Sequence, residues 1–241
     1  PAVIVVPAMG GPERKVAQGL FAPSLTWSRD GTSLIVARRE ADDRAHGLFV
    51  LSLATGESRR LTVPPPEAWA GDVSPELSPD GRTLAFSRAL TRVNSQIHLL
   101  SLSADLRAEG EPRPLTSEST TANDPVWTAD GTRIVFASGA MGSASNPRLR
   151  VLPAAGGRAA EPVPYGEGGE APTIAGPDRL VFVRWVRDEN IWRLPLGDGR
   201  PAERVIVSTR RDIEPRVAPD GQRIAFTSDR SGSHQVWLCN A

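Results

Sequence analysis

The sequence is poor in cysteine, lysine and aromatic residues, and it contains no long apolar run. Cys239 is the only cysteine among 241 residues, which excludes an internal disulfide and any cysteine-based zinc cluster. No apolar run approaches the roughly 18 residues that a membrane-spanning helix requires. The 28 basic and 28 acidic side chains balance, which argues against a general polyanion binder. A hydrophobic content of 39% can build a substantial core, so the composition indicates a globular protein rather than a disordered one.

One phrase recurs five times along the chain: a proline or apolar residue, a short strand, a polar turn and a second apolar strand. The copies are LTWSRDGTSLIVA at residues 25–37, PELSPDGRTLAFS at 75–87, PVWTADGTRIVFA at 125–137, PTIAGPDRLVFV at 172–183 and PRVAPDGQRIAFT at 215–227. Their first residues are 50, 50, 47 and 43 positions apart. A period of this size predicts one supersecondary unit per copy.

The turns inside these copies have a readable chemistry. Aspartate can bond to its own downstream backbone, and glycine accepts the positive φ that closes a hairpin. We therefore predict hairpin turns at Asp30-Gly31, Asp80-Gly81, Asp130-Gly131 and Asp220-Gly221, and we assign these residues a structural role rather than a role in a metal or acid–base site. The fourth copy is one residue shorter and has no glycine after Asp178, which predicts a tighter or distorted hairpin.

A third apolar run follows each hairpin, and a fourth, often arginine-rich, element follows in three of the periods. The third runs are residues 48–53, 97–102, 149–152, 191–196 and 236–239, and the fourth elements are 59–62, 113–116 and 204–207. No apolar pattern with helical spacing persists over about 10 residues. Four short antiparallel strands in a period of about 40 to 50 residues are typical of a β-propeller blade, whereas the common helical repeats are excluded.

The sequence therefore predicts an all-β fold, a β-propeller of four-stranded antiparallel blades. We expect residues 1–241 to form a single propeller domain, with a partial blade at 1–20 and blades at about 21–63, 68–116, 119–163, 168–207 and 209–241. Residues 3–6 and 14–17 read as the third and fourth strands of a blade, and residues 236–239 read as a third strand. Because these ends do not complement each other, the strand count favours a fragment of a larger propeller whose free edges allow self-association. A slipped N-terminal pair that closes the last blade is the alternative.

Two stretches also carry a family resemblance. SPDGRTLAFS at residues 78–87 and APDGQRIAFTSDRSGSHQVWLCNA at 218–241 resemble the WD40-like repeats of TolB-type propellers. DENIWRLPL at 188–196, taken with SDRSGSHQVWLCNA at 228–241, is similar to propellers that follow a winged-helix DNA-binding domain in bacterial regulators. The resemblance implies a propeller over almost the entire chain, but that repeat serves many unrelated functions. It favours a periplasmic or other extracytoplasmic location, which the sequence itself leaves unknown.

The sequence shows no motif that announces catalysis. The three histidines, His46, His98 and His234, fall in three different periods without a chelating neighbour, and we expect each in or beside a solvated loop. The stretch Gly142-Ser143-Ala144-Ser145 lacks the pattern of a nucleophile elbow, and the glycine-rich stretch at residues 166–169 lacks the partners of a phosphate loop. We therefore expect no enzyme activity, no cofactor and no metal.

The connections between second and third strands offer the best candidates for binding. In a propeller they gather on one face around the central channel, so charged groups that are remote in sequence become neighbours. The candidate residues are Arg38, Arg39, Asp42, Arg88, Arg92, Arg184, Trp185, Arg187, Asp188, Asp229 and Arg230. Their mixed signs suit a protein or a small polar ligand better than nucleic acid, which would require a continuous basic stripe.

The tryptophans divide into two groups. Trp27 and Trp127 share a column in the first strand, and Trp192 and Trp237 share a column in the third, which predicts packing between blades. Trp69, Tyr165 and Trp185 fall outside these columns and are candidates for a binding surface.

These observations predict a non-catalytic propeller that binds a protein or a ligand, as the sensor or scaffold part of a larger bacterial regulatory protein. Two alternatives stay open: a TolB-like periplasmic envelope component, and the gating propeller of a serine peptidase whose catalytic domain is absent.

Overall fold

The computed structural model describes residues 1–40, 44–117, 121–139, 147–176, 179–186, 188–197 and 199–241. Within these ranges the chain forms strands and no helix, as the all-β prediction requires. It follows that none of the described segments is a helix able to span a membrane. The chain divides into two compact units, one of Pro1–Met141 with Asn146–Arg184 and one of Gly142–Ser145 with Trp185–Ala241. Each unit is described by itself.

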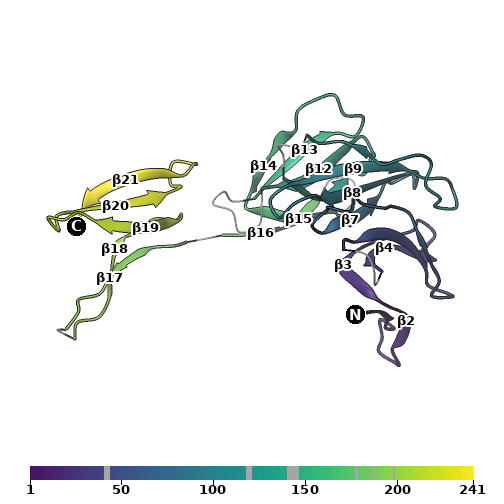
Figure 1. Ribbon diagram of the computed structural model, residues 1–241, viewed down its shortest axis with the longest axis horizontal. Coiled ribbons are helices and arrows are strands. Elements are labelled where there is room, and N and C mark those ends of the chain that lie inside the picture. Colours follow the sequence, from purple (N-terminus) through teal and green to yellow (C-terminus); the bar gives the residue numbers. More distant parts are fainter. Residues whose placement is uncertain (41–43, 118–120, 140–146, 177–178, 187, 198) are drawn as a thin grey trace. The chain divides into compact units, whose positions relative to one another are not determined.

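The first unit contains three four-stranded antiparallel sheets whose strands follow chain order (Figure 1). The strands are β3 (Leu20–Trp27), β4 (Ser33–Arg39), β5 (Gly47–Ser52) and β6 (Ser58–Arg60) in the first; β7 (Gly71–Leu77), β8 (Thr83–Ala89), β9 (Ser95–Ser101) and β10 (Arg113–Pro114) in the second; β11 (Ala122–Trp127), β12 (Arg133–Ser138), β13 (Arg148–Pro153) and β14 (Glu161–Glu167) in the third. Two-stranded sheets flank them, β1 (Ala2–Val5) with β2 (Arg14–Gln18) and β15 (Gly169–Ile174) with β16 (Leu180–Arg184). These sheets are propeller blades, and the predicted fold class is confirmed.

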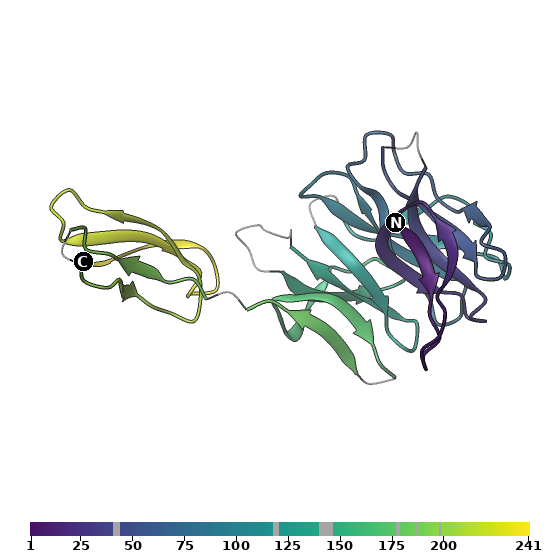
Figure 2. The ribbon, with the colours of Figure 1, turned by 90° about the horizontal axis from the view of Figure 1, so that it is seen from below.

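The second unit contains a two-stranded sheet, β17 (Ile191–Arg193) with β18 (Glu203–Ile206), and a three-stranded sheet. The latter consists of β19 (Asp212–Val217), β20 (Arg223–Ser228) and β21 (Gln235–Asn240), drawn in yellow-green and yellow in Figure 2. The strands expected for the blade at 168–207 therefore appear as two separate pairs, β15–β16 and β17–β18, one in each unit. The single-domain organisation stays a prediction, as does self-association through free edges.

The core lies between neighbouring blades. The second strands are apolar on both faces, so each must be covered on both sides. Ile35 and Leu48 of the first blade join Leu77 and Leu84 of the second in one buried cluster. Ala85 and Leu99 of the second blade join Trp127 and Ile134 of the third in another. Blade stacking therefore buries the apolar strands in the way that the repeat predicts.

The four predicted turns are confirmed. Gly31, Gly81, Gly131 and Gly221 have φ values of 69°, 75°, 69° and 70°, which favour glycine. In each turn the aspartate Oδ1 accepts the amide N–H two residues on, at 2.9–3.1 Å. The fourth hairpin is shorter, as expected: five residues separate the paired Ile174 and Leu180, against six between Val217 and Ile224. Asp178 itself lies outside the described residues.

The first strands of neighbouring blades are joined by polar contacts at a bulge. Ser74 and Asp124 each precede the proline of the repeat and have a φ of 50°, although the position before proline disfavours helical backbone. Ser74 N donates to Ser24 Oγ at 3.0 Å, and Ser74 Oγ donates to Asp124 Oδ1 at 2.7 Å. These bonds run across three blades and offset part of the cost of the unusual backbone.

The environments expected for three single residues were wrong. Trp127 is buried at 6% exposure, but Trp27, in the same column, is 56% exposed. Trp127 packs in a cluster with the second and third strands of the preceding blade, and its Nε1 donates to Glu76 O of the first strand at 3.1 Å. Among the described residues, only the strand pair β1–β2 precedes the blade of Trp27. Trp192 is likewise 56% exposed, whereas its neighbour Ile191 is buried against the three-stranded sheet. His98 lies inside β9, buried beside Phe86, rather than in a solvated loop.

The turn at Asp130 makes a testable prediction about acidity. Hydrogen bonds from the Thr128 hydroxyl, from the Thr132 amide and from the Thr132 hydroxyl lower the pKa of Asp130 from 3.8 to about 2. Because the pKa is lower in the folded state, the stabilisation is complete above the unfolded value and is lost as the pH falls from about 4 towards 2. A carbon-detected NMR titration should place the midpoint near 2, and Thr128→Val should raise it. A midpoint at the ordinary value in the unaltered chain would contradict this account of the turn.

Candidate functional site

The structure places Arg88 in an ion pair inside its own blade. Arg88 Nε lies 2.7 Å from Asp72 Oδ1 and Arg88 Nη2 lies 2.9 Å from Asp72 Oδ2, and the side chain of Asp72 is fully buried. The guanidinium also lies over the ring of Phe86, 5.6 Å from its centroid. The amide of Asp72 donates to His46 O at 2.7 Å, which links this pair to the first blade. Arg88 therefore joins the first and second strands of its blade.

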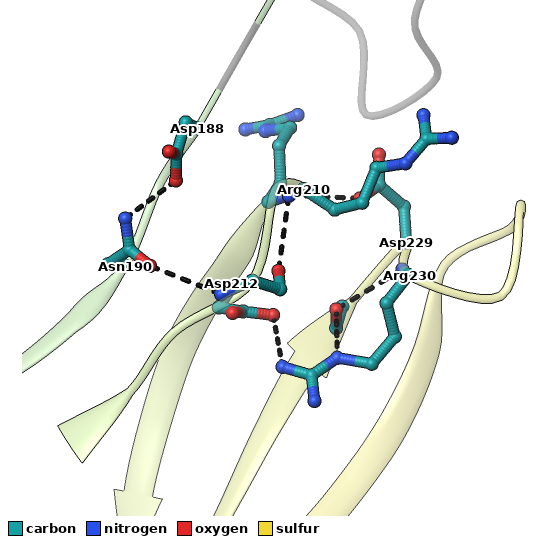
Figure 3. Close-up of polar contacts among 9 residues, drawn as sticks. Asp188, Asn190, Arg210, Asp212, Asp229 and Arg230 are labelled. Carbon is teal, nitrogen blue, oxygen red and sulfur yellow. Dashed lines mark hydrogen bonds and ion pairs between the residues drawn. The ribbon is translucent and has the colours of Figure 1, made fainter.

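The second unit repeats this arrangement (Figure 3). Arg230 Nη2 donates to the buried Asp212 Oδ1 at 2.7 Å. Its guanidinium lies 5.0 Å from the Phe226 ring centroid and 5.3 Å from that of Trp237. The amide of Asp212 donates to Glu189 O, as that of Asp72 does to His46 O.

Asp229 and Asp188, the remaining predicted acids of the second unit that the structure describes, both accept hydrogen bonds. Asp229 is buried, and its Oδ1 accepts the Arg211 amide at 2.9 Å. Asp188 is exposed, and its Oδ1 accepts Asn190 Nδ2 at 2.6 Å, with Asn190 Oδ1 in turn accepting the Ser208 amide at 3.3 Å (Figure 3). The two carboxylates thus order the connections that lead into β17 and follow β20.

The first blade departs from this pattern, because Arg38 has no carboxylate opposite it. The cross-strand neighbour of Arg88 is Asp72, whereas that of Arg38 is Phe21. Arg38 Nη1 donates to Ser58 Oγ at 2.5 Å and its guanidinium lies 5.4 Å from the Phe49 ring centroid, but its Nε is buried without an acceptor. The Nε of Arg39 is also buried without an acceptor. These two donors have no acceptor among the residues that the structure describes.

Trp69 and Arg92 come together on the same side of the first unit, where second strands end and next blades begin; we call this the loop side. Arg92 lies over the indole of Trp69 at 5.6 Å, and Trp69 is 55% exposed. Arg184, at the end of β16, and Trp185 are exposed too, and Tyr165 is 85% exposed at a φ of 61°. Two further predicted residues, Asp42 and Arg187, lie outside the described residues.

The turn side of the first unit, where the Asp-Gly turns lie, carries two grooves that sequence reasoning missed. A groove of about 530 Å³ lies between the first and second blades, and one of about 500 Å³ lies between the second and third. Arg29 and Asp80 line both of them. No motif announces such a groove, because its walls come from turns about 50 residues apart.

Arginines of the fourth strands connect successive blades near these grooves. Arg14 Nη1 donates to Leu53 O at 2.9 Å, Arg59 Nη2 donates to Asp105 O at 3.2 Å, and Arg113 Nη2 donates to Ala154 O at 3.4 Å. Each bond runs from the last strand of one sheet to the turn after the third strand of the next blade. The arginine-rich character of the fourth elements was the only sequence signal for these links.

Within the described residues no group of three or more His, Cys, Asp or Glu side chains is arranged to hold a metal ion. The polar clusters of both units consist instead of arginines, acids and hydroxyls joined in pairs. Such pairs can orient the charged groups of a partner. They do not provide the several oxygen ligands that would bind a cation.

Comparison with known proteins supports the fold. No family model matches the sequence, and no curated protein matches it. A putative TolB from Agrobacterium tumefaciens is similar in structure with a TM-score of 0.54 and 22% identity, over 95% of this chain and 80% of that one. TolB from Acinetobacter baumannii gives a TM-score of 0.55 at 15% identity, over 99% of this chain and 57% of that one. A chain of a nidogen/laminin complex gives 0.57 at 15% identity, over 77% and 64%.

Proposed function

We propose that this propeller, similar in structure to two TolB proteins, is a non-catalytic binding module that recognises a partner protein through the loop side of its first two blades. The single observation that carries the proposal is the exposed Trp69 under the guanidinium of Arg92. Tryptophan and arginine dominate the energetics of protein interfaces, and a stacked pair loses little side-chain freedom on binding.

The arginines of the first blade support the same assignment. Arg38 and Arg39 end β4 on the loop side, and each keeps a buried Nε for which the described part of the chain offers no acceptor. A buried donor without an acceptor costs free energy that a partner's carboxylate or carbonyl group would recover. The partner chemistry that fits best is therefore an acidic protein surface.

The non-catalytic part of the proposal rests on the sequence, which has neither a nucleophile elbow nor a dinucleotide-binding loop. As to the parent protein, the similarity to two TolB structures favours a TolB-like envelope component in a periplasmic or other extracytoplasmic location. The sensor or scaffold part of a bacterial regulator is the second candidate, favoured by the sequence stretches at residues 188–196 and 228–241.

A cross-linking experiment tests the proposed surface. A photoreactive benzoylphenylalanine at position 69 is expected to capture the partner in the source cells, and the same group at Arg158, in the turn after β13, is expected not to. The captured protein is then purified and titrated calorimetrically against the unaltered chain.

Variants of the chain decide the outcome of that titration. The double variant W69A/R92A should weaken binding of the purified partner by about tenfold or more, as expected when an interface anchor is removed. Arg158 is an exposed residue on the turn side, so the R158A variant should bind the partner with unchanged affinity. Unchanged affinity in the correctly folded W69A/R92A variant would contradict the proposal, as would turnover of ester, peptide or glycoside substrates that a single side-chain substitution abolishes.

A further inference from the structure

The larger groove on the turn side combines an apolar lining with arginines. Between the first and second blades, Val50, Leu77 and Leu106 supply apolar surface to a space of about 530 Å³. Arg29, Arg59 and Arg82 line the same space. A concave apolar site with a few converging polar groups is the usual form of a small-ligand site. The polar groups of this groove therefore decide what it can bind.

The carboxylates of the groove are already used by their own turns. Asp30 accepts the Ser28 hydroxyl at 2.6 Å and both the amide and the hydroxyl of Thr32. Asp80 accepts the Ser78 hydroxyl at 2.5 Å and the Arg82 amide at 3.0 Å. These bonds lower the pKa of both carboxyl groups and hold them towards the backbone of the turn.

Asp105, the third acid of the groove, is engaged in the same way. Its Oδ1 accepts the Ser103 hydroxyl at 2.6 Å, and its Oδ2 accepts Arg107 Nε at 2.6 Å. A cation entering the groove would compete with these local bonds for each carboxylate.

The guanidinium groups, by contrast, keep donors available. Arg29 and Arg82 are exposed and make no side-chain hydrogen bond or ion pair with any described residue. Arg59 donates from Nη2 to Asp105 O and Leu106 O at 3.2 and 3.1 Å, which fixes its guanidinium at the groove. The groove thus offers a ligand more free donors than free acceptors.

Arg29 is specific to this place in the repeat. The corresponding turn positions in the other Asp-Gly copies are Pro79, Ala129 and Pro219. Its side chain runs across Gly81, where an added Cβ would lie 2.9 Å from Arg29 Cδ. The glycine that closes the second turn therefore also lets Arg29 lie along the groove.

We infer that this groove binds a carboxylate joined to an apolar group, of the kind found at the C-terminus of a peptide that ends in leucine. The carboxylate would accept paired hydrogen bonds from Arg29 and Arg82, a geometry that guanidinium favours. The apolar group would cover Val50, Leu77 and Leu106. This site lies at the other ends of the strands from the surface proposed above and does not depend on it.

Three probes separate the contribution of the carboxylate to binding from that of the apolar group. Calorimetry compares acetyl-Gly-Gly-Ala-Leu with a free carboxylate, the same peptide as its C-terminal amide, and 4-methylpentanoate. The free acid peptide should bind about tenfold or more tightly than the amide, because the amide cannot form the charged hydrogen bonds. The double variant R29A/R82A should bind both peptides equally weakly, while R158A and W69A/R92A should keep the tenfold preference.

The third probe identifies the source of the ligand. Binding of 4-methylpentanoate as tight as that of the acid peptide assigns the site to small carboxylic acids, and much weaker binding assigns it to a peptide terminus. Either result supports the groove. In the folded, unaltered protein, the Nε–H signals of Arg29 and Arg82 should shift in ¹⁵N NMR on addition of the acid peptide only. Equal affinity for acid and amide, or a preference that survives R29A/R82A, would overturn the inference.

Discussion

Replacing Asp72 by alanine is expected to lower the free energy of unfolding by about 3–5 kcal/mol, because it leaves the Arg88 guanidinium without its buried counter-ion. Asp72 is fully buried, and both of its oxygens receive a hydrogen bond from Arg88. Urea unfolding followed by circular dichroism measures the change. The ion pair between Asp72 and Arg88 also holds the start of β7. We therefore expect that the strands of this blade cannot shift to recover the lost free energy.

The control for this prediction is an ion pair on the surface. Arg107 and Asp105 are 2.6 Å apart, but both side chains are more than 60% exposed, so Asp105→Ala should leave the free energy of unfolding almost unchanged. The double variant D72A/R88M should recover much of the stability that D72A loses, since it removes the unpaired charge. A loss in D72A no larger than that in D105A would show that the buried pair is not what holds these strands.

The second large effect is expected at Trp127. Trp127→Ala should lower the free energy of unfolding by about 3–5 kcal/mol, because it empties a packed site between the second and third blades. It also leaves Glu76 O without the indole donor that lies 3.1 Å away. The same measurement, circular dichroism in urea, applies because it does not depend on tryptophan fluorescence.

Trp27 is the matched control, since it occupies the same column of the repeat. It is 56% exposed against 6% for Trp127, so Trp27→Ala should cost about 1 kcal/mol or less. Equal losses in the two variants would mean that the face of β3 is covered in solution. In that case the packing predicted from the repeat would apply to Trp27 after all.

The hairpin turns were predictable because their determinants are local. Asp80 and Gly81 act on backbone within two residues, so the short phrase SPDGR contains all the information needed. The order and type of the strands followed from the same repeat. The fold could therefore be predicted blade by blade from the sequence.

The candidate site was harder to predict, because its contacts depend on register between distant strands. Arg88 was recognised as a charged residue near a loop, but its partner lies 16 residues earlier in another strand. The signal was present: Asp72 and Asp212 each stand three residues before the proline of their copies, and the other copies have no aspartate there. Aligning that position across the copies would have paired Asp72 with Arg88 correctly. In the last copy the residue that corresponds to Arg88 is Ser228, so Arg230, two residues further on, could not have been paired with Asp212 in this way.

The column of Trp27 and Trp127 shows a different limit. A repeat specifies which residue faces the neighbouring blade, but it does not specify whether strands of that blade are present. Trp127 packs with β8 and β9 and bonds to Glu76 O of β7, whereas the described sheet before Trp27 has only β1 and β2. Whether the tryptophan of this column is buried therefore depends on the strands of the preceding blade and cannot be predicted from the tryptophan alone.

The arginine links between blades have a consequence for how the protein can change. Arg14, Arg59 and Arg113 each bond to the next blade, and among the described residues to no blade beyond it. Such a chain of nearest-neighbour couplings passes a disturbance on only through the adjoining interface. Loops of one blade can therefore be exchanged without retuning distant blades. New recognition specificities can then be acquired one blade at a time on a scaffold whose stability is assembled junction by junction.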